Sequence, residues 1–268
     1  MNKNLLGISL WERFTELAPH LQSGGFSLLE FRIKYGDERK ALIENLKYLQ
    51  KAQEDYSFRV KTIHISNEAD YDVSLLDDEK SELALKKQLE LIDISAQYLK
   101  YAEIVVVHPC HGFVPEDEYE DRIEKSIIQI KKICEHCKTK NLKVAIENLT
   151  EISNIRTSKD LLRIIEAVGD NIGVCYDVNH LFFESPEDFI ENTKNYLITM
   201  HVSDNDGEHE RHWWPGDGCV DFDTICRKLR EINYQGLINF EVDAFRYPLP
   251  SSVQKLYERW SEISDREG

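Results

Sequence analysis

The sequence lacks long hydrophobic runs and flexible linkers. None of its 268 residues fall in a stretch of about 20 apolar residues, the length that a helix needs to cross a bilayer. The N-terminal segment MNKNLLGISLWERF has an apolar run too short for a secretory signal. No segment rich in Pro, Gly or Ser divides the chain. We therefore expect one soluble, cytoplasmic domain over residues 1–268, with no membrane partner.

Positive charge is also scarce. Lys and Arg number 33 against 49 Asp and Glu, which gives a formal net charge of −16 at pH 7. Proteins that bind nucleic acids need clustered Lys and Arg to neutralise phosphates. The densest basic segment, around Lys131 and Lys140, also contains Glu135 and has a helical pattern typical of a solvated face. We therefore expect no nucleic-acid partner.

The six cysteines are too few for a disulfide framework in a chain of this length, and they fit a reducing compartment. Cys134 and Cys137 form a CxxC motif, but no second pair accompanies them and the surrounding pattern is helical. We interpret this pair as ordinary helix residues, not as a redox or zinc site.

The chain alternates eight times between a short β-rich run and a longer amphipathic segment. The predicted strands cover residues 4–9, 26–33, 59–65, 103–108, 142–147, 172–177, 196–202 and 236–242. The predicted helices are Glu12–Leu21, Glu38–Gln53, Lys80–Lys100, Glu118–Lys138, Ser158–Val168, Pro186–Asn195, Phe222–Ile232 and Ser251–Ile263. Strands such as Ile104–Val107 are apolar throughout, as in parallel sheets buried on both faces. The pattern predicts an α/β fold, and eight strands favour a single (β/α)8 TIM barrel over an open doubly wound sheet.

In such a barrel the active site lies at the C-terminal ends of the strands. Six predicted strands have, at or next to their C-terminal end, a residue of a type that binds metals: His64, His108, Glu147, Asp177, His201 and Glu241. Alone, each residue is more often a hydrogen-bonding or capping group. Together at one barrel mouth, three imidazoles and three carboxylates predict a divalent cation, because buried charges are normally paired or coordinate metals.

Other candidate residues follow in the loops after the sixth and seventh strands. His180 lies three residues after Asp177 in YDVNH. Glu210 and His212 have i, i+2 spacing in HERHWWPGDG, which places both side chains on one side if the segment is extended. Glu210 is equally compatible with a surface charge. Trp213 is a candidate for stacking on a ligand, with ordinary loop packing as the alternative.

Six motifs, in order along the chain, carry a resemblance to a known superfamily: HPCHG, AIENLT, GVCYDVNH, HVSDNDG, ERHWWPGDG and NFEV. Together they resemble the xylose isomerase-like barrel superfamily, which contains sugar isomerases and epimerases and the endonuclease IV family of DNA repair enzymes. The resemblance extends from about His64 to Glu241.

The resemblance to the ketose 3-epimerases implies one divalent metal, held by Glu147, Asp177, His201 and Glu241. It also implies that Glu147 and Glu241 act as the acid/base pair and that His180 contacts substrate. The substrate-binding arginine of these epimerases has no counterpart here, because the matching stretch is Ser203-Asp204-Asn205-Asp206-Gly207. Arg211 is the candidate replacement.

The endonuclease IV relatives use a larger set of residues to hold three zinc ions. The matching positions here are His64, His108, Glu147, Asp177, His180, His201, Glu210, His212 and Glu241. Glu210 stands where that family has an aspartate. The expected cofactor is therefore zinc, manganese, magnesium or cobalt, with one site and at most three.

We expect an isomerase or epimerase of a sugar, sugar phosphate or polyol that transfers a proton through an enediolate. Three alternatives stay open: a metal-dependent phosphodiester hydrolase like endonuclease IV, a different small-molecule enzyme on the same metal site, and a binding protein that keeps the fold without the reaction. The sequence is also compatible with a homo-oligomer.

Overall fold

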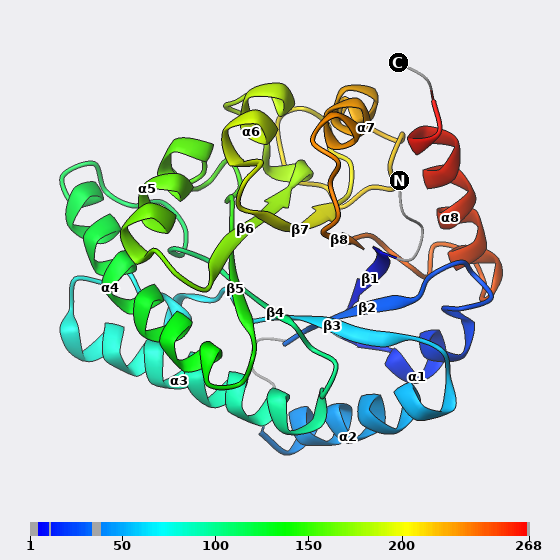
Figure 1. The fold of residues 1–268 in the computed structure, drawn as a ribbon, viewed down its shortest axis with the longest axis horizontal. Helices are drawn as coiled ribbons and strands as arrows, with labels where there is room; N and C mark the ends of the chain where they lie inside the picture. The colour runs from blue at the N-terminus through cyan, green and yellow to red at the C-terminus, as the bar shows by residue number, and fades with distance from the viewer. Residues whose placement is uncertain (1–4, 11, 34–38, 267–268) are drawn as a thin grey trace.

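The eight predicted strands form a closed parallel barrel in the computed structural model, which describes residues 5–10, 12–33 and 39–266. Each strand pairs with its neighbours in the sequence, and β1 pairs with both β2 and β8. The strands are β1 Leu6–Leu10, β2 Leu28–Arg32, β3 Arg59–His64, β4 Ile104–Val107, β5 Lys143–Glu147, β6 Ile172–Asp177, β7 Leu197–Val202 and β8 Leu237–Phe240. Figure 1 shows the helices as a ring around this barrel. The predicted TIM barrel is confirmed, and an open sheet is excluded.

The helices agree with the predicted segments except for the first. They are α2 Arg39–Asp55, α3 Asp78–Tyr98, α4 Tyr119–Lys138, α5 Ser158–Val168, α6 Pro186–Thr193, α7 Phe222–Glu231 and α8 Ser251–Ser264. The predicted helix Glu12–Leu21 is instead a short α1, Phe14–Leu17, followed by a 3₁₀ turn, Ala18–His20. Pro19 explains the difference, because proline has no amide hydrogen and clashes with the preceding helical turn. The first predicted strand begins at Asn4 and the second predicted helix at Glu38. Both of these residues lie outside the described part of the chain.

Side-chain caps stabilise the starts of α5 and α6, the helices that follow the loops after β5 and β6. Thr157 and Asp160 form a reciprocal capping box at the start of α5. Ser185 caps α6, and Pro186 occupies its first turn, where a missing amide hydrogen costs nothing. These caps satisfy backbone amides at the point where each loop ends and its helix begins.

The barrel interior contains polar side chains where bulky aliphatic residues are usual. Asn239 Nδ2 lies 3.2 Å from Oε2 of Glu30, 3.2 Å from Oγ1 of Thr62 and 3.3 Å from Oγ1 of Thr199. Ser9 donates a hydrogen bond of 2.7 Å to the other carboxylate oxygen of Glu30. All five residues are buried. Because buried polar groups must find partners, this layer holds its members in a defined arrangement.

Cys134 and Cys137 are both free and buried on α4. Burial raises the pKa of each thiol to about 12, whereas redox cysteines have lowered pKa values. Among the described residues, no helix combines the length and apolar character that a membrane span requires.

Ile146 is fully buried on β5, directly before Glu147, so its substitution tests the packing of the strand that carries this site residue. Replacing Ile146 with Ala should lower the free energy of unfolding by about 2–5 kcal/mol, since it leaves a cavity between sheet and helices. Urea denaturation measures this change. Ile128→Ala on α4, where the isoleucine is 53% exposed, is the control and should change stability by less than about 0.5 kcal/mol. Equal effects of the two variants would contradict the packing described here.

Candidate metal centre

The six predicted strand-end residues all lie at the C-terminal end of the barrel. Four ligand atoms, one from each of Glu147, Asp177, His201 and Glu241, lie within 4.8 Å of one another. A second group of this kind contains His64, His108 and Glu147. The two groups meet at Glu147, the last residue of β5. The parallel strands therefore bring these side chains together, as the sequence predicted.

The arrangement around His201 suits a cation. Its Nδ1 atom lies 3.1 Å from Oε1 of Glu147, 3.1 Å from Oε2 of Glu241 and 3.7 Å from Oδ2 of Asp177. An imidazole nitrogen carries at most one proton, so it cannot satisfy three carboxylates. Oδ2 of Asp177 is buried and accepts no hydrogen bond in the structure. Three carboxylate oxygens and one imidazole nitrogen fit a divalent ion such as manganese, magnesium, cobalt or zinc.

His64 and His108 approach the other oxygen of Glu147. Their Nε2 atoms lie 3.0 Å and 2.9 Å from Oε2. The carbonyl oxygen of Ile65 lies 2.9 Å from Nδ1 of His64, which directs Nε2 of that ring toward the centre. Metal-binding histidines are commonly held in this way through their second nitrogen. Glu147 is thus placed to bridge two neighbouring sites.

Glu210 contacts the two remaining candidate residues, His180 and His212. Its Oε1 atom lies 3.2 Å from Nε2 of His180 and 2.7 Å from Nε2 of His212. The predicted extended conformation is wrong at His212, where φ is 49° and the backbone turns into the left-handed region. The two side chains still meet because the turn directs the imidazole back toward Glu210. Glu210 therefore pairs with two histidines beside the centre, and its part in binding a metal or a substrate stays a prediction.

The groups at the centre shift one another's pKa values strongly. Burial by itself raises the pKa of Glu147, but the nearby His201 and His108 outweigh burial and keep it well below its usual range. Burial lowers the pKa of His180, yet Asp177, Glu210 and Glu147 together raise it to about 10. In the same way, negative neighbours raise the pKa of His201 well above normal despite its burial. Without a metal, the imidazoles of His180 and His201 thus supply the positive charge that the carboxylates require.

Asp204 organises the loop that carries Glu210 and His212. Its Oδ2 atom accepts hydrogen bonds of 2.8 and 2.9 Å from the backbone of Gly216 and Gly218. Its Oδ1 atom accepts two more backbone hydrogen bonds, from Asn205 at 2.9 Å and Val220 at 3.0 Å. The backbone of Asp204 also pairs with Trp213 in a short antiparallel bridge. In the sequence this stretch stands out for the missing arginine, and nothing local indicates the role of Asp204.

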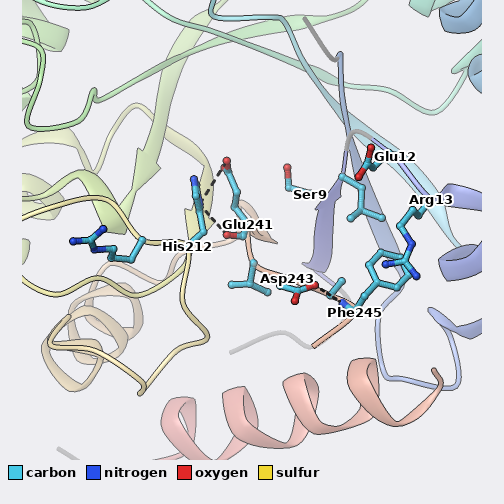
Figure 2. Close-up of a pocket in the computed structure, with 11 residues that line it drawn as sticks. Ser9, Glu12, Arg13, His212, Glu241, Asp243 and Phe245 are labelled. Carbon is cyan, nitrogen blue, oxygen red and sulfur yellow. Dashed lines mark hydrogen bonds and ion pairs between the residues drawn. The ribbon is translucent and has the colours of Figure 1, made fainter. Parts of the chain in front are cut away.

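A cavity of about 380 Å³ opens beside the centre. Figure 2 shows His212 and Glu241 on one side of it, with Glu12 and Arg13 on the other. Arg211 also lines this cavity, and its Nε atom donates to Oδ2 of Asp206 at 2.5 Å. Glu241 therefore belongs both to the metal-ligand group and to the wall of a space large enough for a small molecule.

The two tryptophans of the loop differ in environment. Trp214 is buried against Tyr247 and donates to the carbonyl of Asp243, so loop packing accounts for it. Trp213 is 41% exposed and lines a neighbouring hollow together with His212. The predicted substrate contact of Trp213 thus stays a prediction.

Two residues of β2 near the centre were missed by sequence reasoning. Arg32, the last residue of the strand, forms an ion pair with Oε1 of Glu241. Glu30 is fully buried, and its Oε1 atom lies 2.9 Å from Nε2 of His201. A charged residue inside the apolar strand LLEFR was the available signal, since such a residue must find a partner in the interior.

Comparison with known proteins agrees with this architecture. Residues 19–262 match the profile described as "Xylose isomerase-like TIM barrel". The chain belongs to this family. The match covers the barrel from the first helical turns to α8, and so includes every strand-end residue of the metal centre.

Relatives of this xylose isomerase-like barrel include proteins with and without a named activity. An uncharacterized protein of Methanocaldococcus jannaschii is 25% identical over 74% of this chain and 69% of its own. A ketose 3-epimerase of Arthrobacter globiformis is 31% identical over 38% of this chain and 34% of its own. The crystal structure of a D-tagatose 3-epimerase-like protein, 23% identical, superimposes with a TM-score of 0.77 over 96% of both chains. The structural similarity supports the barrel fold.

Asp204→Ala should loosen the loop of this barrel that carries Glu210 and His212. The substitution leaves four backbone donors without their acceptor, and a hydrogen bond to a charged group typically contributes about 1.5–3 kcal/mol. We expect a lower melting temperature and faster hydrogen exchange over residues 204–220. Glu208→Ala, at an exposed position of the same loop, should change neither. Unchanged exchange in Asp204→Ala would show that other contacts hold the loop.

The metal-free protein should lose stability as the pH rises above neutrality. The pKa of His180 is about 10 in the fold against 6.5 without neighbours, so its charge stabilises the fold fully below pH 6.5 and progressively less up to about pH 10. Thermal unfolding of chelator-treated protein across this range measures the effect. His180→Gln should flatten the profile relative to the unchanged protein. Parallel profiles for the two proteins would contradict the assigned shift.

Proposed function

We propose that the protein is a metal-dependent isomerase or epimerase of a sugar or polyol. The observation that carries this proposal is the group formed by Glu147, Asp177, His201 and Glu241, with ligand atoms within 4.8 Å of one another beside a cavity. The ketose 3-epimerase of Arthrobacter globiformis and the D-tagatose 3-epimerase-like structure support the choice of reaction class.

The residues present divide the work between holding an ion and moving a proton. Asp177 and His201 would hold the ion together with Glu147 and Glu241. A divalent ion bound there would polarise a substrate carbonyl and make the adjacent C–H bond more acidic. His180 lies beside Asp177 and Glu210 and would contact substrate oxygens or an additional ion.

Glu147 and Glu241 are the proposed proton-transfer groups. Glu147 ends β5 and Glu241 directly follows β8, and these strands lie on different sides of the barrel mouth, so the two carboxylates would approach a bound substrate from two directions (Figure 1). Glu241 lines the cavity, which exposes its carboxylate to a ligand there. The pKa of Glu147 is held well below its usual range by His201 and His108, so this carboxylate is ionised at neutral pH.

The charges around the cavity favour a neutral sugar over a phosphorylated one. Arg211 is held by Asp206, and Arg246 forms an ion pair with Asp217. Arg156 donates to the carbonyl oxygen of Glu151 and stacks on an aromatic ring. Arg13, which lines the cavity together with Arg211, pairs with Glu16. Each of these four possible phosphate ligands is therefore already engaged within the protein. An unphosphorylated ketose is therefore our preferred substrate class.

One observation favours a second function, a metal-dependent phosphodiester hydrolase like endonuclease IV. His64 and His108 contact Glu147, and Glu210 contacts both His180 and His212. All nine positions that match the endonuclease IV relatives therefore lie in three adjoining groups. Such a set suits more than one ion. The net charge of −16 weighs against a DNA substrate, because DNA binding depends on neutralising phosphates.

We propose in addition that the chain acts as one domain in the cytoplasm, because six free cysteines suit a reducing compartment.

The test of the proposed function is turnover of free ketoses and their phosphates by protein reloaded with Mn²⁺, Co²⁺ or Zn²⁺. Turnover in deuterated water should place deuterium on the epimerised carbon of a free ketose. Glu147→Gln and Glu241→Gln should each lower kcat by about 10²–10⁴-fold, since each removes a proton-transfer group. Asp177→Asn should lower metal content, measured by elemental analysis.

Glu208→Gln, an exposed change in the loop after β7, is the matched control and should leave turnover and metal content unchanged. Near-normal epimerisation by both Glu147→Gln and Glu241→Gln would refute their roles. Metal-dependent cleavage of an abasic-site DNA duplex, with no turnover of any ketose, would replace the proposed function with the hydrolase.

A further inference from the structure

Glu30 is a buried carboxylate for which the proposed function has no use. It lies in β2, whereas the strand-end residues of the metal centre lie at or directly after the ends of β3 through β8. The pairing of β2 with β3 shifts register between Leu29 and Glu30. Such irregularities redirect side chains next to active sites. The side chain of Glu30 points into the barrel, where it is fully buried.

Both oxygens of Glu30 have partners in the polar layer beneath the metal centre. Oε1 accepts a hydrogen bond of 2.7 Å from Ser9 and lies 2.9 Å from Nε2 of His201. Oε2 lies 3.2 Å from Nδ2 of Asn239. The contact with Nε2 is an ion pair whose N–H direction is not aligned as in a full hydrogen bond. Glu30 is nevertheless fixed at the back of the His201 ring by two other residues.

The two nitrogens of His201 face different surroundings. Nδ1 faces the carboxylates of Glu147, Asp177 and Glu241, where an ion would bind. A nitrogen that binds a metal must present a lone pair, so the proton of a neutral ring must reside on Nε2. Among the described residues, Glu30 supplies the carboxylate oxygen within 4.0 Å of Nε2.

We propose that Glu30 is a positioning residue, which holds the His201 ring and keeps its proton on Nε2 so that Nδ1 is free to bind the metal. A carboxylate that accepts the outer N–H of a metal-binding histidine fixes the orientation of the ring and makes the ligand nitrogen more basic. This inference rests on the metal site of the proposed function and is independent of the reaction catalysed there.

The cost of burying Glu30 supports a role beyond filling space. An ionised carboxylate loses its hydration inside a barrel, and an aliphatic residue would pack there without this cost. Ser9 and Asn239 compensate part of the loss, and His201 supplies the charged partner. The polar layer therefore orients Glu30, and Glu30 in turn orients His201.

The experiment compares Zn²⁺ binding and the imidazole proton signals of the unchanged protein, Glu30→Ala and Glu30→Gln. In the unchanged zinc-loaded protein, the Nε2 proton of His201 should give a downfield NMR signal that exchanges slowly with water, assigned by its loss in His201→Gln. Glu30→Ala should lose this signal and bind Zn²⁺ about 10–100-fold more weakly. Glu30→Gln, which retains an acceptor oxygen without the charge, should keep the signal at a less downfield position and show a smaller loss of affinity.

Asp72→Asn is the matched control, because Asp72 is also a buried carboxylate in an ion pair, with Arg122, away from the metal centre. It should leave Zn²⁺ affinity within twofold even if stability falls. A loss of affinity below fivefold in Glu30→Ala, or an unchanged proton signal, overturns the role of Glu30 while leaving the metal site intact. If Glu30→Ala does not fold, an unshifted signal in Glu30→Gln overturns it equally. Absence of zinc binding by the unchanged protein would instead refute the metal site itself.

Discussion

The crowding of carboxylates around one imidazole nitrogen is the constraint on which the rest of the centre depends. Nδ1 of His201 lies within 3.7 Å of Glu147, Asp177 and Glu241, all of them buried. Negative groups brought this close in a poorly hydrated space repel one another unless a positive charge joins them. Protonated imidazoles meet that need in the metal-free protein, as the raised pKa values of His201 and His180 indicate. A divalent ion would compensate the negative charge of the carboxylates more fully, and the geometry is compatible with one.

The parts of the centre differ in how rigidly they are held. Glu147 and Asp177 end strands of the barrel, where Glu147 pairs with Cys175 of β6 and Asp177 pairs with His201 of β7. Glu210 and His212 lie on a long loop whose conformation depends on the four backbone hydrogen bonds to Asp204. Sites built on strands are held more precisely than sites on loops. The side chains on the strands are thus the more rigidly held part of the centre, and those on the loop depend on the contacts of Asp204.

Much of this centre could be predicted because a parallel barrel converts position along a strand into position in space. His64, Glu147 and Asp177 end their strands, and their side chains were expected to meet for that reason alone. The predicted start of α5 at Ser158 agrees with the structure, in which Thr157 caps the helix. The first helix was predicted too long because its periodic pattern continues through Pro19, which the chain accommodates only by changing to a 3₁₀ turn.

The sequence by itself determined the barrel and its strand-end ligands, because both follow from local periodicity and from where each strand stops. The tertiary structure alone decided what surrounds those ligands. Glu30 and Asn239 are 209 residues apart in the chain, and nothing local indicates that they meet beneath His201. The left-handed turn at His212 and the backbone contacts of Asp204 depend likewise on how the loop closes over the barrel. Such contacts are set by packing between distant segments, which no pattern within one segment encodes.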